Sequence, residues 1–173
     1  QLDLGAVGKG LALGQIHELL KAQHEISAAV ISAGGSILTY GTKPDKSTWK
    51  VGVVDPANTS QNIAILSLEG GWYVATSGDY ERYVEVDGVR YHHIIDPATG
   101  YPTNNNIRSV TIISRDGLLS DALSTACFVL GVEEGLELAK EYEAEALFVL
   151  DGGEVVMSEG LREDYTGVIT ILK

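Results

Sequence analysis

Residues 109–150 read SVTIISRDGLLSDALSTACFVLGVEEGLELAKEYEAEALFVL, and this stretch decides the class of fold. It opens with the segment 109–114, rich in β-branched residues, which is typical of a strand. Two helical segments follow over residues 121–130 and 133–142. Another strand-like run covers residues 146–150. The stretch therefore predicts helices that pack on strands within one folded unit.

The sequence on either side of this stretch is rich in strand-like runs. Such runs, separated by turn residues, occur at residues 27–32, 37–40, 49–54, 63–68, 155–157 and 166–172. Asp87-Gly88 also separates two short runs, which predicts a hairpin because glycine tolerates the positive φ of a tight turn. A helix is expected over residues 7–23, where apolar residues recur at helical spacing. We therefore expect an α+β fold, a mostly antiparallel sheet with helices packed against it, in a single domain over residues 1–173.

The composition excludes several classes of protein. With 12 Lys+Arg against 24 Asp+Glu, the net charge of the 173 residues is −12, which excludes nucleic acid as the main partner. A bound anion would need a metal or local positive groups. The lone Cys127 excludes an internal disulfide, and no apolar stretch approaches membrane-spanning length. The chain begins on Gln1 instead of Met, so we expect an excised piece whose signal or anchor lies outside the sequence.

Two motifs place polar groups on expected helices. DLGAVGKG at residues 3–10 leads into the first helix, whose exposed N–H groups favour a phosphate, although the glycine spacing is not that of a P-loop. The alternative is that these glycines allow close packing against the sheet. Asp121 and Thr125 lie four residues apart on one helix face and carry oxygens of the kind that Mg²⁺ takes. The alternative is that Asp121 caps the helix and Thr125 bonds to a carbonyl one turn earlier.

The densest polar cluster is HHIIDPATGYP at residues 92–102, which leaves a strand and enters a loop. Loops fixed on a sheet are favoured places for chemistry. Adjacent strand histidines face opposite ways, so at most one of His92 and His93 enters a given site. A hydrogen-bonded structural histidine followed by turn residues is the alternative. TSGDYER at residues 76–82 gives a similar strand exit, with a short helical turn as its structural interpretation.

Five ordered blocks, taken together, point to one family. They are residues 3–10, Ala33-Gly34-Gly35, residues 76–82, HIIDPATG at residues 93–100 and DALSTA at residues 121–126. In this order they resemble the blocks of FAD:protein FMN transferases, the ApbE-like flavin-attaching enzymes. The resemblance implies Mg²⁺-dependent transfer of the FMN half of FAD to a Thr or Ser hydroxyl of an acceptor flavoprotein, with release of AMP.

The resemblance also implies roles for single residues. The metal ligands would be the Asp121 carboxylate, the Thr125 hydroxyl and the Ala6 carbonyl, and the contacts to the flavin nucleotide would come from Asp3, Lys9 and Ile95. Asp121 would be essential for catalysis through the metal. Our own hypothesis is that His93 is the general base for the acceptor hydroxyl, because an imidazole titrates near neutral pH.

The sequence departs from the family pattern in two respects. Ser32 and Ser36 flank the Ala-Gly-Gly block, where the family usually has Asn before it and often an acid or amide after it. Members also carry a sizeable N-terminal portion ahead of the block that starts at Asp3. We therefore expect this chain to be the C-terminal portion of a longer protein. The family's usual location implies that the full-length protein is extracytoplasmic and lipid-anchored to the membrane through the absent portion.

Two other functions stay open at this point. Water could replace the acceptor hydroxyl, which would make the protein an Mg²⁺-dependent FAD pyrophosphatase that yields FMN and AMP. A non-catalytic module that binds flavin or a partner is the other. The acceptor motif of flavinylated proteins does not occur in this sequence, which favours the transferase over its protein substrate.

Overall fold

The structure of the protein is a computed structural model that describes residues 4–163 and 169–172. The helices are α1 (Gly8–Ala22), α2 (Gly117–Leu130), α3 (Val132–Glu141) and α4 (Glu159–Glu163), with a 3-10 turn, η1, at Asp151–Gly153. The strands are β1 (Ala28–Ala33), β2 (Ser36–Gly41), β3 (Trp49–Asp55), β4 (Asn58–Leu68), β5 (Tyr73–Gly78), β6 (Tyr83–Val86), β7 (Val89–His92), β8 (Ile107–Ser114), β9 (Glu145–Leu150), β10 (Val155–Met157) and β11 (Ile169–Ile171). Within the described ranges, no helix is long and apolar enough to cross a membrane.

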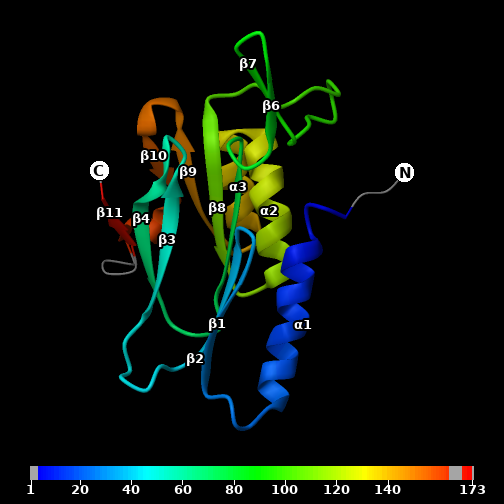
Figure 1. Ribbon diagram of the computed structural model, residues 1–173. Helices are drawn as coiled ribbons and strands as arrows, with labels where there is room; N and C mark the ends of the chain where they lie inside the picture. The colour runs from blue at the N-terminus through cyan, green and yellow to red at the C-terminus, as the bar shows by residue number, and fades with distance from the viewer. Residues whose placement is uncertain (1–3, 164–168, 173) are drawn as a thin grey trace.

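The largest sheet has six strands in the order β1-β2-β5-β8-β9-β10, and every neighbouring pair is antiparallel. A second antiparallel sheet has the order β11-β4-β3, and β6 and β7 form a separate hairpin. Helices α1, α2 and α3 lie on one side of the six-stranded sheet, and the three-stranded sheet lies on the other (Figure 1). This arrangement confirms the expected α+β fold with helices packed on a mostly antiparallel sheet.

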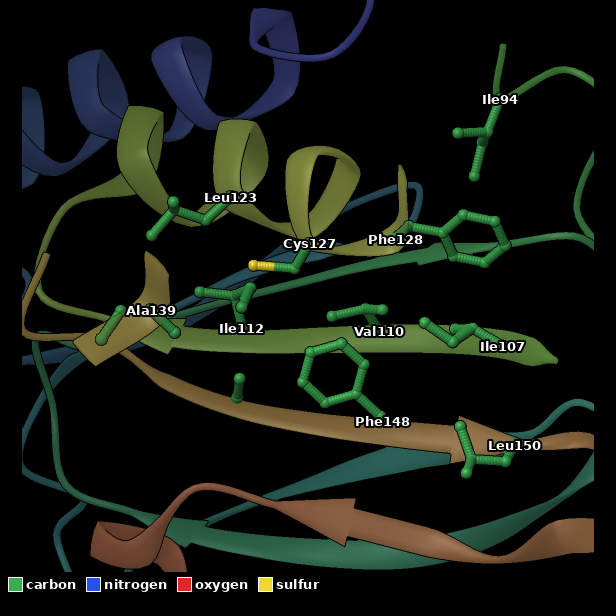
Figure 2. Packing of buried hydrophobic residues seen from close by; sticks show 12 residues of the cluster. Ile94, Ile107, Val110, Ile112, Leu123, Cys127, Phe128, Ala139, Phe148 and Leu150 are labelled. Carbon is green, nitrogen blue, oxygen red and sulfur yellow. The ribbon is translucent and has the colours of Figure 1, made fainter. Parts of the chain in front are cut away.

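Strand β8 contributes to the core on both faces of the sheet because successive side chains of a strand point to opposite sides. Val110 and Ile112 join the cluster around Phe128 of α2 (Figure 2). Ile113 joins the other main cluster, which contains Val51 of β3. Burial on both faces therefore explains why Ile112 and Ile113 can both be apolar at adjacent positions.

Helix α2 begins at Gly117, earlier than the expected start at residue 121. Its cap is Asp116, whose side chain accepts a hydrogen bond from the N–H of Leu119 at 2.9 Å. The interpretation of Asp121 as the cap of its own helix is therefore wrong. The last expected strand, residues 166–172, is observed at Ile169–Ile171, while residues 166–168 lie outside the described residues.

Two glycines let α1 and α2 approach closely. A Cβ atom at Gly10 would overlap the carbonyl oxygen of Gly117, and one at Gly117 would lie 2.6 Å from the carbonyl oxygen of Gly10. The close packing that Gly10 allows is thus against helix α2, whereas the alternative interpretation of the sequence placed it against the sheet. A Cβ atom at Gly10 would also lie 2.7 Å from the Cβ of Asp121, so this contact brings the first turn of α1 onto Asp121.

Candidate functional site

The carboxylate of Asp121 is the centre of the candidate site. The residue is only 2% exposed. Its Oδ2 accepts a hydrogen bond from the backbone N–H of Gly10 at 2.9 Å, and its Oδ1 accepts one from the hydroxyl of Ser36 at 3.2 Å. The ammonium of Lys9 lies 3.3 Å from the same Oδ1. One buried carboxylate therefore ties α2 to the first turn of α1 and to the start of β2.

Asp121 occupies the position of a cap for α1. The residue that precedes this helix, Val7, makes no side-chain cap, and no acidic residue lies in the first turn. Gly10 is the third helical residue, and its N–H is one of those that a helix leaves without a partner inside itself. The carboxylate on α2 accepts that N–H, at the positive end of the helix dipole. The fold thus places a buried carboxylate at the start of α1.

Thr125 lies one turn after Asp121 on α2, as the four-residue spacing predicts. The hydroxyl of Ser77 on β5 is 3.1 Å from the Thr125 hydroxyl and 2.8 Å from that of Ser124. The alternative in which Thr125 bonds to a carbonyl one turn earlier is not observed in the described residues; Ser124 instead donates to the carbonyl of Asp121 at 2.8 Å. The face of α2 that continues from Asp121 is therefore lined by hydroxyl groups.

The carbonyl of Ala6 lies at the same end of α1. In a regular helix it would accept the N–H of Gly10, four residues later, but that N–H goes to Asp121. No described residue donates a backbone or side-chain hydrogen bond to this carbonyl. The predicted nucleotide contact Asp3 lies outside the described residues.

This set of oxygens fits a hard divalent cation. A carboxylate, a hydroxyl and a backbone carbonyl are ligands of the kind that Mg²⁺ binds, with water or phosphate in the remaining positions. The set includes only one acid, Asp121. No group of three or more His, Cys, Asp or Glu residues suited to a metal occurs in the described part of the chain. The chemistry of these donors is of the kind that would suit Mg²⁺, with water or phosphate in the remaining positions.

The adjacent histidines at the end of β7 have different surroundings, as the strand geometry predicts. His92 accepts the N–H of Ile94 at Nδ1, so its Nε2 carries the proton that is donated to the carbonyl of Thr103 at 3.0 Å. Its ring also meets Phe128 edge-on, with centroids 5.5 Å apart. Both ring nitrogens of His92 are used, so this histidine is structural.

His93 is exposed and keeps one nitrogen available. Its Nδ1 lies 3.2 Å from the carbonyl oxygen of Arg82, and its backbone N–H donates to the same oxygen at 3.1 Å. A carbonyl only accepts hydrogen bonds, so Nδ1 carries the proton in the neutral ring, and Nε2 keeps its lone pair. No described residue forms a hydrogen bond with Nε2. This is the tautomer that a general base requires.

Ile95 begins the turn that follows the two histidines. It is 47% exposed and forms a bridge with Pro102. Asp96 closes the turn: its side chain accepts the N–H of Ala98 at 2.8 Å, and its own N–H donates to Tyr101. The residues from Asp96 onward thus do form a turn, and that turn holds Ile95 at the surface beside His93.

Glu81, which belongs to the TSGDYER block, interacts with both the histidine block and the Asp121 region, a role that no local sequence pattern indicates. Its Oε1 would lie 3.0 Å from a Cβ atom at Gly35, in the turn before β2. Although the residue is exposed, desolvation of its carboxyl is the largest cause that raises the pKa of Glu81. Electrostatic interactions with Lys9 and His93 lower this pKa, and the interaction with Asp121 raises it further. These four side chains therefore share one electrostatic environment.

Asp79 in the TSGDYER block has a structural role. Its carboxylate accepts a hydrogen bond from Nε of Arg108 at 2.7 Å, and Arg108 also bonds to Asp151 at 3.2 Å. This ion-pair network joins the end of β5 to β8 and to η1. It lies apart from Asp121 in hydrogen bonding, because no described residue bonds to both acids.

Comparisons with known proteins agree with this architecture. The model of the ApbE family matches residues 1–148. The FAD:protein FMN transferase of Treponema pallidum (strain Nichols) is 42% identical over 170 residues, which cover 93% of this chain and 47% of that protein. The FAD:protein FMN transferase of Klebsiella pneumoniae (strain 342) is 38% identical over 94% of this chain and 49% of its own length.

Solved structures show the same fold. The ApbE protein from Thermotoga maritima superimposes with a TM-score of 0.86 at 42% identity, over 94% of this chain and 52% of that one. The apo form of the flavinyl transferase ApbE from Pseudomonas stutzeri gives a TM-score of 0.77 at 35% identity, over 94% and 51% of the two chains. The chain thus spans about half the length of the relatives that it matches.

Proposed function

Because this chain belongs to the ApbE family, we propose that it supplies the metal and pyrophosphate side of an FAD:protein FMN transferase. The curated relatives carry that name. In the proposed reaction, the FMN half of FAD passes to a Thr or Ser hydroxyl of an acceptor flavoprotein, and AMP is released. The activity is proposed for the whole protein, of which this chain corresponds to about half by the length of its relatives.

The buried carboxylate of Asp121 is the observation that carries this proposal. With Thr125 and the carbonyl of Ala6 it offers the oxygen ligands that suit Mg²⁺, and its charge is held at the start of α1. Bound there, Mg²⁺ would neutralise phosphate oxygens and stabilise the charge that develops on them during transfer. In a protein of net charge −12, an anionic dinucleotide needs such a concentrated positive centre.

Three further residues are proposed to contact the nucleotide. Lys9 has a side chain that is 38% exposed next to Asp121, so its ammonium can reach a phosphate that approaches from solvent. Ile95 is exposed and lies two residues after His93, and we propose that its backbone contacts the nucleotide. Asp3 completes the set by the family resemblance alone, since it lies outside the described residues.

We assign the proton transfer to His93. The acceptor hydroxyl gives its proton to Nε2 while its oxygen forms a bond to the FMN-side phosphorus. The bond from that phosphorus to the bridging oxygen breaks, and the bridging oxygen leaves with AMP. The carbonyl of Arg82 holds the Nδ1 proton and so keeps Nε2 free for this step.

Covalent flavin on an acceptor protein is the direct test. The full-length protein, FAD, Mg²⁺ and an acceptor with a Thr or Ser flavinylation site are incubated, and flavin fluorescence is read on the denatured acceptor. We expect His93→Ala to lower the transfer rate by at least a hundredfold while FAD binding is kept. His24→Ala removes an exposed histidine after α1 and should react normally. Transfer by His93→Ala at the unsubstituted rate would remove His93 from the mechanism.

The products separate the other candidate functions. Free FMN together with AMP, formed at the same rate without an acceptor, would indicate an FAD pyrophosphatase. No AMP under either condition would indicate a module that only binds.

We also propose that the full-length protein acts outside the cytoplasmic membrane, as a lipid-anchored protein. The family resemblance supports this location. Fractionation of cells that express the full-length protein tests it, and recovery in the cytosolic fraction would overturn it.

A further inference from the structure

Lys9 forms an ion pair with the carboxylate of Asp121, and a metal that binds to this carboxylate would have to displace the ammonium. In the protein, Oδ1 of Asp121 is contacted by both the Lys9 ammonium at 3.3 Å and the Ser36 hydroxyl at 3.2 Å, while Oδ2 accepts the N–H of Gly10. The carboxylate that is proposed to bind Mg²⁺ thus already has a cationic partner. A lysine ammonium and a divalent cation on one carboxylate would repel each other at short range.

The three donors to Asp121 differ in how easily they can leave. The N–H of Gly10 belongs to the backbone of α1, which is fixed against Gly117. The Ser36 residue is only 1% exposed, so its hydroxyl has little room to move. Lys9 has a long stem and a side chain that is 38% exposed. Of these three groups, Lys9 is therefore the one that solvent reaches most readily, and its exposed face is called the open side of the site.

A second anion is available to Lys9 once it leaves Oδ1. The charge of Lys9 already lowers the pKa of Glu81, so the two groups lie within electrostatic range of each other. The phosphates of a nucleotide that approaches the open side of the site would be a stronger partner still. The ammonium therefore does not have to return to bulk water without compensation.

We propose that Lys9 is an exchangeable counter-ion of Asp121. Without a metal, its ammonium neutralises the buried carboxylate. When a divalent cation binds to Asp121, the ammonium moves off Oδ1 toward the open side of the site, where phosphates approach, while Gly10 and Ser36 keep their hydrogen bonds. This inference rests on the proposed metal site. It adds an order of events: Lys9 leaves Oδ1 when the divalent cation binds, and Lys9 is then available to hold the phosphates of the nucleotide.

Metal affinity measured without any nucleotide tests the exchange. Mg²⁺ is titrated into the protein by calorimetry for the unsubstituted chain and for Lys9→Met. Removing the competing charge should tighten Mg²⁺ binding by about threefold to fivefold, the upper part of the range expected for a partly exposed ion pair that no longer has to be broken. Lys9→Gln, which keeps a polar chain of similar length, should show the same change and guards against misfolding of one variant.

Lys21→Met is the matched control. Lys21 lies on the same helix and forms an ion pair with Glu18 at 2.7 Å, far along α1 from Asp121. The substitution makes the same change in net charge, so it reports any general electrostatic effect. We expect its Mg²⁺ affinity to stay within twofold of the unsubstituted value.

Stability gives a readout that does not depend on affinity. In EDTA, Lys9→Met should melt at a lower temperature than the unsubstituted chain because the buried carboxylate has lost its counter-ion. At saturating Mg²⁺ this difference should disappear, since the metal now supplies the charge.

The outcomes separate this inference from the proposed function. If Asp121→Ala abolishes Mg²⁺ binding and Lys9→Met binds as the unsubstituted chain does, or more weakly, the metal site stands and the exchange is overturned. If the unsubstituted chain binds no Mg²⁺, or if Asp121→Ala binds it normally, the metal site itself is wrong and the exchange falls with it.

Discussion

At the scale of single residues, Asp121 combines a structural and a chemical role. Its carboxylate caps α1 from outside that helix and is also the acid proposed to hold the metal. The carboxyl of Asp116, five residues earlier, caps α2, and no described residue hydrogen-bonds to both carboxylates. The two acids therefore allow the capping contribution to be separated from the metal site.

Substitution of these acids should give different results. Asp121→Ala should lower the free energy of unfolding by about 2–3 kcal/mol, because the N–H of Gly10 and the hydroxyl of Ser36 lose a charged acceptor, and it should abolish Mg²⁺ binding. Asp116→Ala should cost about 1 kcal/mol, the usual value of a helix cap, and leave Mg²⁺ affinity intact. Urea denaturation and calorimetry measure the two quantities. Loss of Mg²⁺ affinity in Asp116→Ala would show that α2 as a whole, and not Asp121, determines metal binding.

Part of the candidate site could be predicted from the amino-acid sequence. The four-residue spacing predicts that Asp121 and Thr125 share a face, because helix periodicity is a local property. The partners of Asp121 could not be predicted, since Gly10 and Ser36 are distant in sequence and only folding brings them together. One of those partners is Ser36, which follows the Ala-Gly-Gly block at the position where the family often has an acid or amide.

At the scale of elements, the close approach of α1 and α2 determines whether the site forms. The approach depends on the absence of side chains at Gly10 and Gly117. Helix propensity alone would favour alanine at either position, so the contact has to compensate for the lower helix stability of glycine. The hydrogen bond from Gly10 to Asp121 exists because of this approach.

Alanine substitutions at two glycines of α1 test whether the site depends on this close approach. Gly10→Ala places a methyl group against the carbonyl of Gly117, so it should lower the free energy of unfolding by about 2–3 kcal/mol and weaken Mg²⁺ binding. Gly14→Ala is the control on the same helix. A Cβ atom there meets nothing within 4 Å, so this variant should gain about 0.5–1 kcal/mol from helix propensity. Thermal unfolding with and without Mg²⁺ measures both effects, and equal stability of the two variants would contradict the packing argument.

At the scale of the whole molecule, the two main sheets share one core. Val74 and Ile113 of the six-stranded sheet belong to the same buried cluster as Val51 and Ile63 of the three-stranded sheet. The other face of the six-stranded sheet packs on the helices (Figure 2). The six-stranded sheet contributes residues to both clusters. Loss of packing on one of its faces should therefore also destabilise the packing on its other face.

We therefore expect the chain to unfold in a single cooperative step. Trp72 packs against the cluster between the sheets, so tryptophan fluorescence reports mainly on that side, whereas far-UV circular dichroism is dominated by the helices. The urea transitions from the two probes should coincide in midpoint and slope. Separate transitions would show that the three-stranded sheet is an independent unit and that the expected single domain is wrong.

The class of fold and the family could be predicted from the amino-acid sequence, and so could the residue types of the candidate site. Each of these depends on local signals: apolar periodicity, turn residues such as Asp87-Gly88, and short ordered blocks. Tertiary structure decided which groups meet. It made His92 structural, left Nε2 of His93 without a hydrogen bond from any described residue, and placed Lys9 on the carboxylate proposed for the metal. Hydrogen-bond direction and charge pairing depend on distances between elements far apart in the chain, and no local pattern encodes those distances.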